Sequence, residues 1–312
     1  MISVASPHDE FFKAVFSDPA HAAELVRLAA HGSSAPRIES RSLRLLPGSF
    51  IEPPLREIYS DLLFEARLGA ARSLVYVLFE HKSSPEHLTL LQLYRYMGAI
   101  WERPESRPVN TLPRIIPIVV YHGNRTWRVP RTFGEYFAED PSGLDEIGPE
   151  LRPLFLDLSE VADALLPRAS PAVRAALLAM RHAFRPGATD VSAILNPAIT
   201  EIVTEAARQF FFALGTYLMR TSTGEERRVI LQIVTAPRAR EVVMTIAEEL
   251  QREGALRDRQ EVLVRLLTRK FGLTDDERSH IERTTDPERL TAALDEILVA
   301  GRKEQVLEKL GR

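Results

Sequence analysis

The chain contains no cysteine among its 312 residues. Disulfide bonds, thiolate nucleophiles and zinc–sulfur sites are therefore excluded. It also lacks any window near the roughly 20 apolar residues that a membrane-spanning helix needs. Met1 to Ala5 is too short an apolar run for a signal peptide. We therefore expect a protein of the reducing cytoplasm that does not engage a membrane.

A large charge of either sign is lacking as well, because the formal net charge is −3. Such a balance excludes a protein that coats nucleic acid by bulk electrostatics, so any nucleic-acid surface must be local. One local excess runs from Arg95 to Arg131, with seven arginines and two acids. Solvated surfaces often carry such stretches, so this one is weak support for nucleic-acid binding by itself.

Lysine is scarce, because only five of the 40 cationic side chains are lysine. A bias of this kind points to genomic base composition, and it makes a lysine in a strand more informative than usual. Lys82 follows the apolar stretch Leu74 to Phe79, which predicts a strand buried on both faces. The ionisable residues Glu80, His81 and Lys82 at the end of such a strand need an explanation.

The order of the predicted elements indicates an α/β fold followed by a helical region. Ser6-Pro7-His8-Asp9 is typical of a helix start, and a second helix is predicted from Pro19 to about Ala30. Alternation, apolar runs and turn residues predict strands at 58–68, 74–79, 115–121 and 154–158 and a helix at 85–102. From about Ser159 onward the pattern is helical.

The length favours two domains, which we place at residues 1–221 and 222–312, with the joint at Thr221 to Gly224. Pro117 lies inside a predicted strand and favours an edge strand or a bulge there, because proline donates no ladder hydrogen bond. In the helical region, breaks are expected at Pro237 and Gly254, and helix starts at Thr274 and Asp286.

The first two long strands predict a hairpin that turns at residues 69–72. If the turn centres between residues 70 and 71, Leu63 faces Leu78 and Asp61 faces Glu80. Directly opposed residues have Cβ atoms about 5 Å apart, and two carboxylates so close repel each other unless a cation lies between them. Oxygen ligands suit Mg²⁺ or Mn²⁺. Asp61 and Glu80 are therefore predicted metal ligands.

Lys82 is predicted to lie beside Glu80, because side chains i and i+2 on a strand point the same way, while His81 points to the other face. An amine there can orient or help deprotonate a water, or offset charge that builds up on a phosphate. The alternative is that Glu80 and Lys82 only solvate a strand end, since acid-x-Lys arises by chance about once in a chain of this length.

The helix predicted at 85–102 places Gln92 and Tyr96 four residues apart and so on one face, from which they can reach the same site. Tyr96 has a competing place in the core, because Leu93 and Met97 show that most of this helix is buried. Several other candidates have a structural explanation that is at least as good. His8, His81 and His122 are expected to be structural or surface histidines. Asp9 and Lys13 are expected to form a cap and a surface ion pair, and Trp127, between Arg125 and Arg128, is expected in the core.

Several stretches resemble the recombination-promoting nuclease (Rpn) family of the PD-(D/E)XK nuclease superfamily, which is also catalogued with transposases. The most distinctive is Leu78-Phe79-Glu80-His81-Lys82-Ser83-Ser84-Pro85, where many members have glutamine in place of the lysine. The other matching stretches are residues 8–19, 60–64, 95–97 and 117–123. Residues 257–310 are similar to a small helical domain of unknown function that often follows such nucleases.

The resemblance implies an α/β fold with a PD-(D/E)XK nuclease-like mixed sheet flanked by helices, followed by a mostly α-helical C-terminal region. It implies Mg²⁺-dependent cleavage of DNA, with Asp61 and Glu80 as ligands and Lys82 as the catalytic amine. Gln92 and Tyr96 match the Gln-x-x-x-Tyr pattern of related RecB-like nucleases more loosely. The expected cofactor is therefore Mg²⁺ or Mn²⁺, and the expected partner is DNA.

Three readings of function remain open at this point. The first is a metal-dependent DNA endonuclease associated with recombination or mobile-element biology. The second is a catalytically inactive nuclease-like fold that binds DNA or protein, with homo-oligomers formed through the C-terminal helices. The third is a helical scaffold whose α/β half is incidental. All three core groups of a nuclease site are present, which favours the enzyme.

Overall fold

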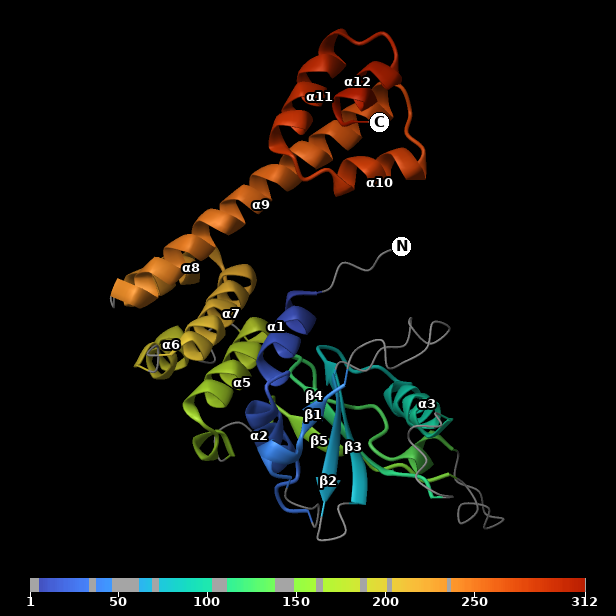
Figure 1. The fold of residues 1–312 in the computed structure, drawn as a ribbon, viewed down its shortest axis with the longest axis vertical. Coiled ribbons are helices and arrows are strands. Elements are labelled where there is room, and N and C mark those ends of the chain that lie inside the picture. The colour runs from blue at the N-terminus through green and yellow to red at the C-terminus, as the bar shows by residue number, and fades with distance from the viewer. Residues whose placement is uncertain are drawn as a thin grey trace. The chain divides into compact units, whose positions relative to one another are not determined.

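The computed structural model describes residues 6–33, 38–46, 62–68, 73–102, 111–137, 149–160, 165–185, 190–200, 204–234 and 237–311. The chain is an α/β protein with a mixed sheet flanked by helices and a mostly helical C-terminal region, which confirms the predicted fold class (Figure 1). It divides into two compact units, Met1–Val243 and Met244–Arg312. Within the described part of the chain, no helix combines the length and apolar character needed to cross a membrane.

Two capped helices open the first unit, α1 (Pro7–Phe16) and α2 (Pro19–Ala29). The Ser6 side chain accepts a hydrogen bond from the backbone N–H of Asp9, and Asp18 caps α2 in the same manner. In both helices a proline occupies the first turn, where no N–H is needed. Both predicted helices are therefore confirmed.

Among the described residues, the sheet has five strands, in the order in which they occur in the chain. They are β1 (Arg44–Leu45), β2 (Leu62–Leu68), β3 (Ser73–Lys82), β4 (Arg114–Tyr121) and β5 (Leu154–Asp157). The pairs β1–β2 and β2–β3 are antiparallel, whereas β3–β4 and β4–β5 are parallel. Helix α3 (Thr89–Glu102) joins the parallel strands β3 and β4, which is the usual use of a crossover helix.

The predicted register of the β2–β3 hairpin is confirmed where the structure describes it. Leu63 pairs with Leu78, and the ladder ends at the pair of Leu62 with Phe79. The next pair in the prediction is Asp61 with Glu80. Asp61 lies outside the described residues, as does the predicted turn at 69–72.

The position predicted for Pro117, an edge or a bulge, is confirmed as a local edge. The strand β4 as a whole lies between β3 and β5, but Pro117 pairs with Leu78 of β3 and the pairing with β5 begins only at Ile118. The predicted start of the helix at residue 85 is wrong, because α3 begins at Thr89. The Glu86 carbonyl accepts hydrogen bonds from both the backbone N–H and the hydroxyl of Thr89 and so fixes that start.

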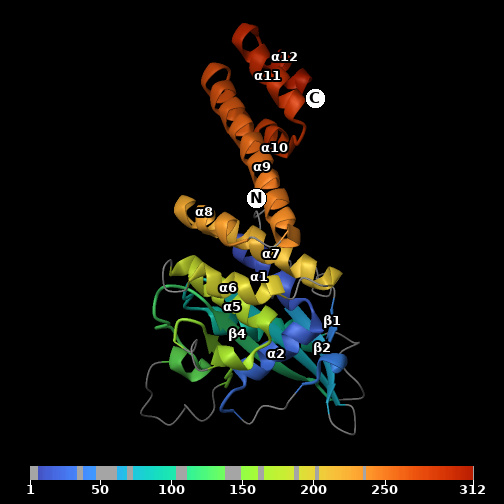
Figure 2. The same cartoon turned by 90° about the vertical axis from the view of Figure 1, so that its left-hand side faces the viewer.

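Alternation along β3 divides its side chains between two environments. Tyr76 faces α3 in a core that includes Leu93, Tyr96 and Val119. The intervening side chains face the opposite surface, where Phe12 of α1 lies against the ring of His81. Figure 1 shows α3 on one side of the sheet and α1, α2 and α5 on the other, and Figure 2 shows α1, α2 and α5 in front of the sheet.

Further helices of the first unit follow β5. They are α5 (Pro171–Phe184), α6 (Val191–Thr200), α7 (Glu205–Thr221) and α8 (Gly224–Ile233), and short 3₁₀ helices cover Ser40–Ser42, Phe133–Tyr136 and Leu166–Arg168. A helix break is present at the predicted joint, because Thr223 separates α7 from α8 and forms a capping box with Glu226.

The second unit is a helical cluster built on the later part of α9 (Pro237–Lys270), with α10 (Asp275–Arg283), α11 (Pro287–Val299) and α12 (Lys303–Lys309). Its core contains Leu263, Leu267, Ile281 and Leu290. The predicted break at Gly254 is wrong, because α9 continues through it; the flanking residues are strong helix formers that outweigh one glycine. The division into units falls inside α9, whereas the predicted domain boundary lies between α7 and α8.

Candidate active site

Glu80 and Lys82 lie together at the end of β3, on the face that is covered by α3. The Lys82 Nζ atom is 3.1 Å from Glu80 Oε1, and the side chain of Lys82 is 9% exposed and that of Glu80 4%. The strand places them side by side because residues two apart on a strand share a face. Burial of both charges is tolerated because each offsets the other. The explanation that they merely solvate a strand end is therefore excluded.

Gln92 of α3 joins the two charged groups. Its amide nitrogen donates to Glu80 Oε1 at 3.1 Å, and its amide oxygen accepts from Lys82 Nζ at 3.2 Å. A carboxylate can only accept and an ammonium can only donate, so this pairing determines which way the amide points. Gln92 therefore holds both groups in one orientation from the helix side.

Tyr96 lies one helical turn further along α3 and is almost fully buried. Its hydroxyl oxygen accepts a second hydrogen bond from the Gln92 amide nitrogen, at 2.7 Å. The ring also belongs to the core between α3 and the sheet. Tyr96 thus fills the core and extends the polar group, and the two roles foreseen for it are compatible.

The surroundings of Lys82 keep its amine protonated. Burial by itself would lower its pKa, but the negative charge of Glu80 and the hydrogen bond to Glu86 outweigh burial and raise the pKa of Lys82 above its ordinary value. A lysine in this state donates hydrogen bonds and offsets negative charge, and it does not accept a proton. The geometry therefore favours charge compensation over general-base chemistry for this residue.

One residue of the site was not predicted. The Glu86 Oε2 atom lies 2.9 Å from Lys82 Nζ, and the Glu86 side chain is 55% exposed. Its spacing of four residues from Lys82 is a signal only on a helix, and these two residues are not on one helix.

The donor atoms present suit a hard divalent cation, but the described residues supply only part of a site. Within the described ranges, no group of three or more His, Asp or Glu side chains has a metal-binding arrangement. Glu80 contributes one buried carboxylate at the strand end, and the second predicted ligand, Asp61, lies outside the described residues. The oxygen chemistry of Glu80 agrees with Mg²⁺ or Mn²⁺.

A second polar group lies on the opposite face of the sheet, behind the Glu80–Lys82 pair. The His81 Nε2 and His122 Nε2 atoms are 2.6 Å apart, and the planes of the two rings are within 14° of parallel. The distance between the two nitrogens is that of a hydrogen bond. At the other edge of the ring, His81 Nδ1 is 3.2 Å from Asp9 Oδ1, and His122 Nδ1 is 3.3 Å from the Met180 carbonyl.

The partners in this chain assign the protons. The Met180 carbonyl can only accept, so His122 Nδ1 carries a hydrogen, and its Nε2 then accepts from His81. Burial, followed by the nearby charges of His81 and His8, lowers the pKa of His122 well below its ordinary value. The hydrogen bond to His81 lowers the pKa of Asp9 to about 2. Asp9 is therefore a carboxylate and His122 a neutral ring at neutral pH.

This arrangement corrects the expectation for Asp9. The Ser6 cap is present, but the Asp9 carboxylate pairs with His81 of the sheet. The structural role expected of the three histidines is confirmed, because His8 also donates to or accepts from the Tyr217 hydroxyl at 2.8 Å.

The loop after β4 approaches the site end of β3 closely. A side chain at Gly123 would overlap the Ser83 carbonyl and the Tyr121 ring, so only glycine fits there. Trp127 is buried against Tyr121 and Phe155, which confirms it as a core residue. Its exposed neighbours in this loop are Arg125 and Arg128.

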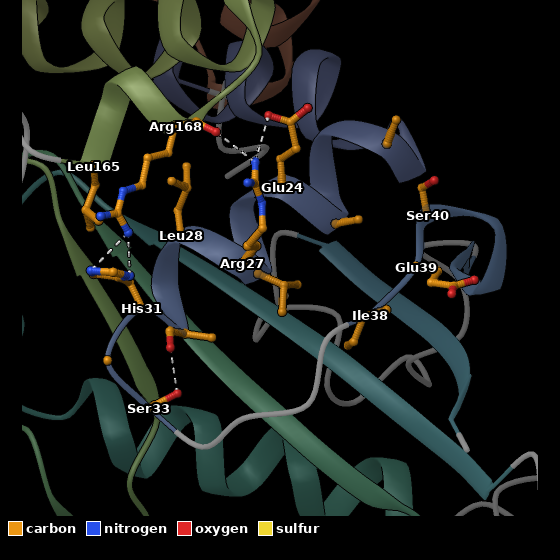
Figure 3. A pocket seen from close by; sticks show the side chains of 15 residues that line it. Glu24, Arg27, Leu28, His31, Ser33, Ile38, Glu39, Ser40, Leu165 and Arg168 are labelled. Carbon is orange, nitrogen blue, oxygen red and sulfur yellow. Dashed lines mark hydrogen bonds and ion pairs between the residues drawn. The ribbon is translucent and has the colours of Figure 1, made fainter. Parts of the chain in front are cut away.

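A cavity of about 810 Å³ lies elsewhere, between α2 and the 3₁₀ helices near Ser40 and Leu166. Figure 3 shows Arg168 beside His31 on one side of it and Arg27 beside Glu24 on another. Glu80, Lys82, Gln92 and Tyr96, the predicted catalytic residues that the structure describes, do not line this cavity.

The fold and the site define an α/β protein with a carboxylate–lysine centre at the end of an interior strand. The chain belongs to the family described as "Putative transposase, YhgA-like", whose model matches residues 6–209. The match covers α1, α2, the sheet and the helices up to the first turns of α7. The second unit lies beyond it.

Curated relatives come from Escherichia coli. The chain is 27% identical over 260 residues to the recombination-promoting nuclease RpnD of strain O157:H7. This alignment covers 80% of this chain and 96% of RpnD. The chain is 28% identical over 261 residues to the inactive recombination-promoting nuclease-like protein RpnE of strain K12, with 81% and 84% coverage. The nuclease RpnA of K12 is 29% identical over 119 residues, 38% of this chain and 41% of that protein. No solved structure matches the chain.

Proposed function

We propose that the chain is a Mg²⁺- or Mn²⁺-dependent DNA endonuclease that hydrolyses phosphodiester bonds, with a role in recombination or mobile-element biology. The observation that carries this proposal is the connected group of Glu80, Lys82, Gln92 and Tyr96, all buried or half-buried at one strand end. Relatives that are named as recombination-promoting nucleases support the class of reaction.

Each residue has a separate task in the proposed mechanism. Glu80, with Asp61, would hold the divalent ion, which would supply Lewis-acid chemistry for the hydrolysis. Lys82 remains an ammonium and donates to a phosphate oxygen as negative charge grows there. Gln92 keeps Glu80 and Lys82 aligned through its two hydrogen bonds, and Tyr96 fixes Gln92.

Substrate contact outside the centre is assigned by the same proposal to exposed arginines. Arg125 and Arg128 lie in the loop that approaches the end of β3, and Arg95 is exposed on α3. Arginine binds backbone phosphates without reading sequence. Trp127 takes no part in base stacking because it is buried in the core.

The test is a Mg²⁺ titration of plasmid cleavage with supercoiled and linear DNA. Wild-type protein is expected to cleave in Mg²⁺ and to stop in EDTA, and Asp61→Ala and Glu80→Ala are expected to lose at least about 100-fold in rate, as enzymes do when a group that stabilises the transition state is removed. Glu102→Gln, an exposed acid at the end of α3, is the control for loss of one charge. Variants that cut as fast as wild type would disprove the proposal.

A second candidate is an inactive nuclease-like fold that acts as a DNA-binding or protein-interaction module. It is favoured by the relative that is named inactive, RpnE, which matches the chain over 81% of its length. This candidate predicts DNA binding that needs no metal ion and is unchanged in Lys82→Ala. Absence of cleavage in both Mg²⁺ and Mn²⁺ together with such binding would select it.

A further inference from the structure

Acceptor atoms surround the Lys82 ammonium group on all of its donor sides in this structure. An ammonium has three donors, and three acceptor atoms surround Lys82 Nζ: Glu86 Oε2 at 2.9 Å, Glu80 Oε1 at 3.1 Å and Gln92 Oε1 at 3.2 Å. The proposed role of Lys82 needs one donor directed at a phosphate oxygen. One of the three acceptors must therefore leave before substrate can be contacted.

Glu86 differs from the other two acceptors in its exposure and in its connections. Its side chain is 55% exposed, whereas that of Glu80 is 4% exposed. Gln92 is held twice more, by Glu80 and Tyr96, while the Glu86 carboxylate has Lys82 as its hydrogen-bond partner. The backbone of Glu86 is anchored through its carbonyl to Thr89, so the side chain can turn away without moving the start of α3.

We propose that Glu86 is a displaceable positioning residue, whose carboxylate holds Lys82 until a phosphate group of DNA takes its place. This inference rests on the proposed function of the site. A phosphate oxygen carries negative charge and accepts hydrogen bonds as a carboxylate does, so it can replace Glu86 at the same donor.

The exchange also makes Glu86 a determinant of affinity. When a phosphate approaches Lys82, the Glu86 carboxylate loses its partner and lies near a like charge, which disfavours the complex. A lone phosphate contact is therefore bound weakly, and further contacts along the backbone are needed to open the site. The occupant that fits is an extended polyanion rather than a single phosphate group.

The experiment compares wild-type protein with Glu86→Gln, which keeps an oxygen acceptor but loses the charge. The first readout is acylation of Lys82 by a small amine-reactive ester, measured by mass spectrometry of peptides, with the other four lysines of the chain as internal references. Loss of the Glu86 charge should raise Lys82 acylation at least threefold over the references. An unchanged rate would overturn the proposal.

The second readout is DNA binding in EDTA, by fluorescence anisotropy with a labelled duplex. Glu86→Gln should tighten binding by roughly two- to fivefold, the size expected for release of one exposed ion pair. The control Glu102→Gln measures the effect of charge alone, and the excess over it should vanish when Lys82→Met is added. Equal tightening by both variants, or weaker binding of Glu86→Gln, would overturn the proposal.

Both readouts are free of metal, so they separate this inference from the proposed function. Absence of Mg²⁺-dependent cleavage by wild-type protein would refute the nuclease proposal and leave the acylation result interpretable. Cleavage by wild-type protein with no change of acylation or binding in Glu86→Gln would refute the role of Glu86 alone.

Discussion

At the scale of single residues, β3 sends three consecutive ionisable side chains to two different surroundings. Glu80 and Lys82 face α3 and pair with each other, while His81 faces α1 and pairs with Asp9. The alternation of a strand separates the two groups even though they are adjacent in the sequence. One strand end thus carries a candidate catalytic group on one face and a buried polar chain on the other.

The buried polar chain makes stability depend on pH. The pKa of His122 lies well below its ordinary value of 6.5 in the folded protein, so below about pH 6.5 the unfolded chain binds a proton that the folded chain does not. The free energy of unfolding should therefore fall as the pH drops from 7.5 to 5.5, by at most about 1.4 kcal/mol per pH unit from this residue. Urea unfolding at a series of pH values measures it.

His122→Asn is the matched variant for this measurement, because it removes the ring that titrates. The pH dependence between 7.5 and 5.5 should become shallower, although His8, whose pKa burial also lowers, retains a part of it. An identical slope in the variant would show that His122 is not the group responsible. Asp9 acts separately: its contribution is present above about pH 4 and is lost as the pH falls toward 2, its pKa in the folded protein.

Tyr96 allows a test of the alignment role of Gln92. Tyr96→Phe removes the hydroxyl that accepts a hydrogen bond from Gln92 and leaves the ring in the core. We expect a loss of about 0.5–1.5 kcal/mol in the free energy of unfolding and a fall in cleavage rate of less than tenfold, because Glu80 and Lys82 still hold Gln92. A fall as large as that of Glu80→Ala would make Tyr96 catalytic in its own right.

At the scale of elements, the meeting of two strand ends forms the site. The Lys82 carbonyl accepts a hydrogen bond from the His122 N–H, so the chain leaving β4 is tied to the end of β3. Gly123 follows at once and lies against the Ser83 carbonyl and the Tyr121 ring. The position of Lys82 therefore depends on Gly123, which contributes no side chain to the site but permits this close approach.

Gly123→Ala tests this close approach. The added methyl group would overlap the backbone carbonyl oxygen of Ser83, which cannot turn away, and the buried Tyr121 ring, so the free energy of unfolding should fall by about 1–3 kcal/mol. Gly98→Ala in α3 is the control, because a methyl group there meets nothing within 4 Å and should stabilise the helix by about 0.5–1 kcal/mol. Urea unfolding midpoints compare the two, and equal effects would contradict the close-approach argument.

Local patterns explain how much of these elements could be predicted from the sequence. Caps at Ser6 and Thr223, the β2–β3 register and the shared face of Glu80 and Lys82 depend on residues that are near in the sequence. The interior position of β4 in the sheet does not follow from its own sequence, because it depends on β5, which follows more than 30 residues later. Tertiary neighbours decide such features, and a local pattern does not contain them.

The contacts of Glu86 and Asp9 could not be predicted for the same reason. Glu86 reaches Lys82 through the irregular path of residues 83–88, and Asp9 reaches His81 through the packing of α1 on the sheet. Neither path has a periodicity that the sequence can show. Ion pairs between separate elements are therefore the part of the candidate site that required the structure.

At the scale of the whole molecule, the chain has two units with separate cores. The family model ends at residue 209, so the second unit is not part of the family match. The second unit also contains an ion pair between Lys303 and Glu277, at 2.9 Å, and a capping box at Thr274. We propose that this unit forms homo-oligomers, which the mass in solution with and without residues 225–312 would test.

Separate cores predict separate unfolding. Leu267 is fully buried in the second unit, so Leu267→Ala should cost that unit about 2–5 kcal/mol. Both tryptophans of the chain, Trp101 and Trp127, lie in the first unit, so their fluorescence reports that unit alone. The variant should lower the melting temperature of the second unit, which the circular dichroism of its helices follows. The melting temperature followed by tryptophan fluorescence should stay unchanged. A shift of both transitions would show that the units unfold together.

The central claim is that the strand-end pair of Glu80 and Lys82 hydrolyses DNA with a divalent ion. Glu80→Gln tests it most directly, because the amide keeps an oxygen for Lys82 and Gln92 while it loses the charge that binds the ion. The measurement is the initial rate of supercoiled plasmid cleavage in Mg²⁺, with the melting temperature as a check of folding. We predict a rate at least about 100-fold below wild type with an unchanged fold, and a rate equal to wild type would contradict the account.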